Sequence, residues 1–162
     1  MNSARKVLIA GGTVLALVGM LYGLHYAVFV EHQTLDRMGG SLASAFVSAA
    51  ERQLPESRAA LDAYTSAKYD YVRQVDLHGH WIGLAMLMIV LGVVFDELAF
   101  SERARLAIAL AMLVGSIMFP LGVILQTLGM GPLGSALAIA GSALVIAALG
   151  ATAVGLMRGE AT

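Results

Sequence analysis

The amino-acid sequence predicts an all-α integral membrane protein, a four-helix bundle with a helical extracytoplasmic insert between its first and second spans. Hydrophobic residues make up 59% of the 162 residues and charged residues only 13%, whereas soluble domains carry about 25% charge. The hydrophobic residues gather in four long runs, with most charges between them. Lipid is therefore the expected solvent, and we expect a single membrane domain over residues 1–162.

Each apolar run is close to the length that a helix needs to cross a bilayer, since about 20 residues span about 30 Å of hydrocarbon. None shows the two-residue alternation of a barrel strand, and backbone groups in lipid must be satisfied internally. Helices are therefore expected over residues 7–30, 77–95, 106–128 and 133–157.

The first run follows Arg5 and Lys6, as the apolar region of a signal peptide would. It is longer than the usual apolar region of about 7–15 residues, and residues 22–26 make a poor small-residue cleavage site. We expect it to remain as a membrane helix.

Lys and Arg in the short flanks predict the orientation. They precede the first span, separate the second from the third, and follow the fourth, at Arg5, Lys6, Arg103, Arg105 and Arg158. Four crossings place them all on one side, which the positive-inside rule makes cytoplasmic. Both termini are then expected in the cytoplasm, and residues 31–76 outside, in a protein of the bacterial inner membrane.

Residues 31–76 are expected to form a helical outer cap. Gly39 and Gly40 are expected to break the helical structure before an Ala-rich helix over residues 41–54. Pro55 suits the first turn of the next helix. Residues 56–76 contain neither Gly nor Pro. This second helix is therefore expected to run without interruption into the second span.

Small residues recur along the spans and predict close helix packing. Gly134 and Gly141, seven residues apart, share one face of the fourth span, which indicates a tight helix contact either inside the protein or with a partner. Asp96 and Glu97 close the second span and are expected to be solvated.

Several function classes are excluded. The absence of cysteine removes disulfides, iron–sulfur clusters and Cys nucleophiles, and the balance of 10 Lys and Arg against 11 Asp and Glu gives no footprint for nucleic acid. No established catalytic motif is present. A stand-alone enzyme is therefore not expected.

All four histidines lie near the outer ends of the first two spans, at His25, His32, His78 and His80. By residue count, His25 and His80 are expected at similar depth, and His32 shares a face with His25 if the helix continues. Ionisable groups in spans are costly and usually face the bundle interior. We therefore expect imidazoles from two helices to be offered to each other, although a hydrogen bond to a carbonyl or a lipid headgroup would equally explain any one of them.

His78 and His80 point about 200° apart on a helix, so one is expected to be a ligand and the other a surface group. Which of them faces the bundle stays open. Gln126, near the outer end of the third span, is expected at a similar depth and could bond an imidazole or a quinone carbonyl. The methionines within the spans could bind haem or copper(I), but flexible core filling is their commoner role.

The segment His78-Gly79-His80-Trp81-Ile82-Gly83-Leu84 resembles small membrane proteins distantly similar to the haem-copper oxidase superfamily. The resemblance covers about residues 21–30 and 77–92. It implies a b-type haem, with His78 or His80 as an axial ligand and His25 as a plausible partner. The long insert over residues 31–76 departs from that pattern.

Three hypotheses follow. The first is a b-type haem-binding electron-transfer protein or redox-complex subunit, with copper as the alternative cofactor, bound by His25 and His80 or His78. The second is a cofactor-free accessory subunit that docks through its glycine-rich spans onto other membrane subunits or a homo-oligomer. The third is a metal or pH sensor that uses all four histidines.

Overall fold

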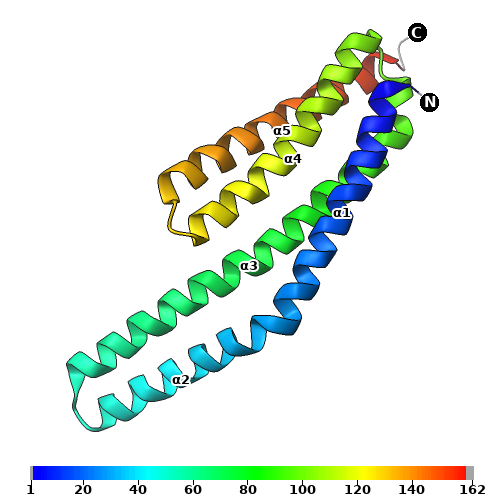
Figure 1. Cartoon of the computed structure of the whole chain (residues 1–162). Helices are drawn as coiled ribbons and strands as arrows, with labels where there is room; N and C mark the ends of the chain where they lie inside the picture. The colour runs from blue at the N-terminus through cyan, green and yellow to red at the C-terminus, as the bar shows by residue number, and fades with distance from the viewer. Residues whose placement is uncertain (1, 160–162) are drawn as a thin grey trace. The chain divides into compact units, whose positions relative to one another are not determined.

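The computed structural model describes residues 2–159, which form five α-helices and one short 3₁₀ helix, and these residues include no strand. The predicted all-α fold is confirmed. The elements, drawn in Figure 1, are α1 (Ser3–Phe29), α2 (Glu31–Ala50), α3 (Leu54–Val94), η1 (Phe95–Glu97), α4 (Glu102–Thr127) and α5 (Gly131–Gly159).

Four of the helices, α1, α3, α4 and α5, are long and apolar enough to cross a membrane. They match the four apolar runs of the sequence. The 41 residues of α3 form one uninterrupted helix, as the lack of Gly and Pro over residues 56–76 predicts. The apolar part of α3 is therefore preceded by a long polar part of the same helix.

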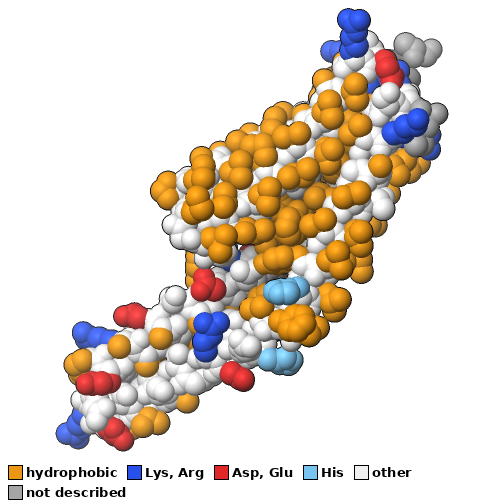
Figure 2. All heavy atoms as spheres, in the orientation of Figure 1, with side chains coloured by type: hydrophobic (Ala, Val, Ile, Leu, Met, Phe, Trp, Pro, Cys, Tyr) orange, Lys and Arg blue, Asp and Glu red, His pale blue; other side chains and the backbone are white. Residues whose placement is uncertain are grey.

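The chain divides into two compact units. The bundle unit comprises the residues up to Met20 and those from Leu77 onward, and the hairpin unit comprises Leu21–Asp76. Hydrophobic side chains cover the visible face of the bundle unit's helices, whereas charged side chains are spread along the hairpin unit (Figure 2).

Helices α4 and α5 of the bundle unit pack through glycines. A Cβ atom added at Gly115 would lie 2.7 Å from the backbone oxygen of Gly141, and one at Gly134 would lie 2.6 Å from that of Gly122. No side chain fits at such separations, so the two backbones touch directly. Gly134 and Gly141 therefore serve a contact inside the protein, and the alternative that a partner covers them is wrong.

Helices α1 and α3 also pack closely at glycines. A Cβ atom at Gly12 would lie 2.8 Å from the backbone oxygen of Ala85, and one at Gly92 would lie 2.7 Å from Cγ1 of Ile9. The glycines thus hold the bundle unit's helices close together, which gains dispersion contact where no hydrophobic force acts between helices in lipid.

The hairpin unit pairs α2 with the first half of α3. The hydroxyl of Ser57 donates to the backbone oxygen of Ala45 at 3.0 Å, and both residues are buried. The connection between the helices is tight, with Arg52 in the left-handed region at φ 60°. Pro55 is the second residue of α3, within its first turn as predicted.

The interruption predicted at Gly39 and Gly40 is wrong, because α2 runs through both glycines from Glu31 to Ala50. Two helical glycines cost about 2 kcal/mol relative to alanine. Packing of α2 on α3 through Ala45, 4% exposed, and the Ala-rich sequence that follows offset that cost.

The real break lies earlier, at Val30, whose φ and ψ of −122° and −40° separate α1 from α2. Hydrogen bonds bridge this break, because the amide of Val30 donates to Tyr26 and its own carbonyl accepts from Thr34. The Tyr26 ring lies 6.5 Å from that of Tyr71, whose hydroxyl is 3.4 Å from a carboxylate oxygen of Glu31. Aromatic and polar contacts thus join the three helix segments at this point.

Candidate functional site

His78 is half-buried, with Nδ1 2.9 Å from the backbone oxygen of Gly19 on α1. The approach depends on the glycine, because a Cβ atom there would lie only 3.0 Å from Cβ of Trp81. A carbonyl oxygen can only accept a hydrogen bond, so Nδ1 must carry the proton. A neutral imidazole then presents a lone pair on Nε2, the form in which histidine binds a metal.

His80 has a different environment. It is exposed, and its ring meets that of Phe119 on α4 edge-on, with 4.9 Å between the centroids and 74° between the planes. The two histidines therefore contact different helices, α1 and α4, as their spacing on a continuous helix predicts. His78 is the one that engages the bundle through a hydrogen bond to α1.

His25 and His32 belong to the hairpin unit and are both exposed. The ring of His25 lies 5.4 Å from that of Phe29, one turn later on the same helix. His32 lies beyond the break at Val30, so the single helix assumed for a shared face ends between them. The predicted approach of His25 to His80, which belongs to the other unit, stays a prediction.

Gln126 lies on the α4 surface that meets α5. Its Cγ atom would be 2.9 Å from a Cβ atom at Gly134, and the residue is half-buried. This packing gives Gln126 a role in the contact between these two helices. The predicted bond to an imidazole or a quinone carbonyl stays a prediction.

The bundle unit contains an apolar pocket whose lining includes Trp81 but not His78. Three helices, α1, α3 and α4, enclose a volume of about 510 Å³, within the range of about 300–1,000 Å³ typical of ligand sites. Trp81, one helical turn after His78, contributes to its wall. The lining is entirely apolar: Ala10, Gly11, Val14, Leu15, Val18, Trp81, Leu113, Ile117 and Leu121.

Among residues 2–159, no three His, Asp or Glu side chains are grouped closely enough to hold a metal ion.

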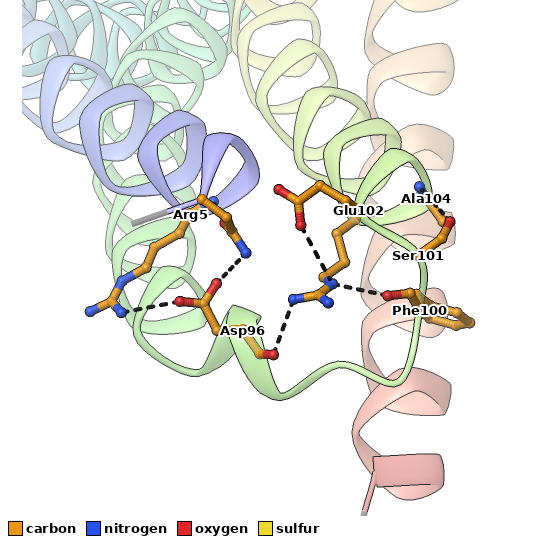
Figure 3. A network of polar contacts seen from close by, with 8 residues as sticks. Arg5, Asp96, Phe100, Ser101, Glu102 and Ala104 are labelled. Atoms are coloured by element: carbon orange, nitrogen blue, oxygen red, sulfur yellow. Dashed lines mark hydrogen bonds and ion pairs between the residues drawn. The ribbon is translucent and has the colours of Figure 1, made fainter.

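Sequence reasoning missed a polar network at the other end of the bundle unit, drawn in Figure 3. Asp96 forms an ion pair with Arg5 at 3.3 Å and a hydrogen bond with Asn2, and its backbone oxygen accepts from Arg105 at 3.1 Å. Asp96 is exposed, as predicted, and it is also paired, which the sequence reasoning did not predict. Ser101, which caps α4 by accepting from the amide of Ala104 at 3.3 Å, was the sequence signal for this turn.

The network places flanks of all four predicted spans at one end of the bundle unit. Arg5 and Asp96 join α1 to η1, and the amide of Ala99 donates to the backbone oxygen of Gly155 on α5 at 3.1 Å. The start of α1, the α3–α4 connection and the last part of α5 thus lie together. An even number of crossings requires this arrangement.

No family model, curated protein or solved structure matches this chain. The fold and the histidine geometry therefore define only a class: an all-α protein with four helices that could span a membrane.

Proposed function

We propose that the chain is a membrane b-type haem-binding protein that transfers electrons, alone or as a subunit of a redox complex, with His78 as an axial ligand. The observation that carries the proposal is the hydrogen bond between His78 Nδ1 and the Gly19 carbonyl. Metal-binding histidines commonly donate their other ring nitrogen to a carbonyl or carboxylate, which fixes the ring and raises its basicity.

The surroundings of His78 fit the group. The apolar pocket would receive the hydrophobic part of the macrocycle, and the porphyrin itself provides the remaining in-plane ligands. This makes haem a better fit than copper, which needs several protein donors at one place. A bound haem would supply one-electron transfer, while the Gly19 carbonyl orients the His78 ring.

The test is the absorption spectrum of the detergent-purified chain, as isolated and after titration with haemin. We expect a Soret band that His78→Ala shifts or weakens and His32→Ala leaves unchanged. His25→Ala and His80→Ala test the two candidates for a second ligand, because loss of one axial ligand shifts the band without removing it. Circular dichroism verifies that each variant is helical.

No Soret band in the parent chain, or an unchanged band in His78→Ala, would reject haem binding through His78.

A cofactor-free accessory subunit is the alternative, and one observation favours it. One face of α5 carries only small exposed residues at a spacing of three and four: Ala136, Ala140, Ala143, Ala147 and Gly150. Small residues on an exposed apolar helix allow another membrane helix to approach closely. In this alternative, the exposed face contacts the partner, whereas Gly134 and Gly141 contact α4.

The alternative predicts that Ala143→Leu releases a co-purifying membrane partner while His78→Ala does not. Retention of the partner by Ala143→Leu would reject docking through this face.

A further inference from the structure

The hairpin unit has too small a core for a structure outside lipid. Its buried residues over α2 and the first half of α3 are Thr34, Ala45 and Ser57, all small. The large apolar side chains instead remain exposed, Phe46 at 69% and Leu54 at 60% among them. The unit holds twelve of the chain's 21 charged residues, which marks it as facing water. Two helices of this length normally need further packing partners.

Three exposed apolar residues of α3 form a line, while Tyr69 and Val75 lie about 60° to either side of it. At about 100° per residue, Leu54, Leu61 and Val72 fall within about 20° of one another. This line lies about a quarter turn from the face that contacts α2, which Ser57 and Tyr71 mark through their hydrogen bonds. The apolar line is therefore beside the α2–α3 contact.

Helix α2 carries a matching line. Leu35 and Phe46 lie about 20° apart and about a quarter turn from the contact face that Thr34 and Ala45 mark. On both helices, the apolar line is reached from the contact face by a rotation about the helix axis. This rotation has the same sense as the rotation of the chain from one residue to the next. Because α2 and α3 run antiparallel, equal displacements bring both lines to the same side of the hairpin.

The opposite side of the hairpin has a different composition. It lies about a quarter turn from the α2–α3 contact face, in the direction away from the apolar line. The positions there hold no apolar side chain larger than alanine, as shown by Gln33, Arg37 and Ser44 on α2, and by Glu56, Ala63 and Asp70 on α3. The hairpin is thus two-sided, with one face built for burial.

We propose that the apolar side of the hairpin, defined by Leu35, Phe46, Leu54, Leu61 and Val72, packs against the same side of a second copy of this chain. A two-fold axis parallel to the two helices of the hairpin brings these apolar sides together. Helix α2 of one copy then lies against α3 of the other at equal height, which completes an antiparallel four-helix bundle.

The register and the charges agree with this arrangement. The Ser57–Ala45 and Tyr71–Glu31 hydrogen bonds set the heights of the two helices. They place Phe46 at the level of the partner's Leu54, and Glu31 within one turn of the partner's Lys68. Glu31 and Lys68 both lie between the contact face and the apolar line, toward the centre of the bundle. Two opposite-charge pairs therefore meet across the axis.

The bilayer surface is a less suitable partner for the apolar side of the hairpin than a second copy of the chain. Helices that lie on membranes are rich in Lys and Arg on their polar face, whereas the hairpin is net acidic. Its charged residues are seven acidic, Glu31, Asp36, Glu51, Glu56, Asp62, Asp70 and Asp76, and five basic, Arg37, Arg52, Arg58, Lys68 and Arg73.

The absence of native cysteine permits a clean crosslinking test in the full chain. Two differently tagged variants, Phe46→Cys and Leu54→Cys, are reconstituted together in phosphatidylcholine vesicles and oxidised. The control replaces Leu54→Cys by Glu56→Cys, which lies at a similar height on the opposite side. We expect several-fold more disulfide-linked heterodimer from the Leu54→Cys mixture than from the control.

Equal yields in the two mixtures, or no heterodimer in either, would overturn the proposal. A second measurement guards against a failure of disulfide chemistry: Leu61→Arg lowers energy transfer between fluorescently labelled copies in vesicles, and Ala63→Arg leaves it unchanged. Neither readout depends on a cofactor, so this proposal and the haem proposal can fail separately.

Discussion

His78 and Gly19 join α3 to α1 through a hydrogen bond of 2.9 Å between an imidazole and a backbone carbonyl. The bond exists because glycine at position 19 lets the two helices approach, and a Cβ atom there would lie 3.0 Å from Cβ of Trp81. One residue thus sets both the helix spacing and the protonated nitrogen of the histidine. Both the stability of the bundle unit and the availability of Nε2 depend on this pair.

We predict that His78→Ala lowers the free energy of unfolding by about 0.5–1.5 kcal/mol through loss of this hydrogen bond. His80→Ala, at an exposed position, is expected to have a smaller effect. Unfolding by sodium dodecyl sulfate titration in mixed micelles, followed by circular dichroism, measures both. Equal losses in the two variants would contradict the assignment of His78 to the interior.

Gly134→Ala should destabilise the bundle unit by about 1–3 kcal/mol, because the added methyl group meets the backbone of α4 and forces α5 away. Gly150 on the same helix has no atom within 4 Å of its Cβ position. Gly150→Ala should therefore be neutral or stabilising by about 0.5–1 kcal/mol. Thermal unfolding in detergent compares the two, and a reversed order would refute the α4–α5 contact.

The Arg5–Asp96 ion pair is partly exposed, with 34% and 39% of the two side chains accessible. We expect a coupling energy of about 0.2–1 kcal/mol that decreases as salt is added. A double-mutant cycle of Arg5→Gln and Asp96→Asn, measured at low and high ionic strength, provides it. A coupling near zero, or one that does not decrease with salt, would contradict an ionic interaction between the two side chains.

Arg52 adopts a φ of 60° in the turn between α2 and α3. Left-handed backbone costs a non-glycine residue about 1 kcal/mol, so Arg52→Gly should stabilise the hairpin unit by about 0.5–1 kcal/mol. Arg58→Gly, within helix α3, should destabilise it by about 1 kcal/mol. Hydrogen exchange of the hairpin amides reports both changes, and protection that falls in Arg52→Gly would contradict the turn geometry.

Hydropathy and the positions of Gly and Pro were sufficient to predict much of the fold. The four long apolar helices, the place of Pro55 in a first turn and the continuity of α3 through residue 76 all follow from local composition, because helix formation in lipid is dictated by length and backbone satisfaction. The same local reasoning failed at Gly39 and Gly40. There the cost of glycine is about 2 kcal/mol, which packing between helices can offset.

By itself, the sequence determined the number and position of the apolar helices and the gathering of histidines near the ends of the first two apolar runs. Only the tertiary structure decided that Gly134 and Gly141 face α4 rather than a partner, and that His78 rather than His80 bonds to α1. Periodicity gives the face of a helix on which a residue lies, but the neighbour of that face depends on contacts between residues far apart in the chain. Those contacts depend on close backbone approach at positions such as Gly19 and Gly122. Local sequence patterns do not identify the residues that these glycines contact.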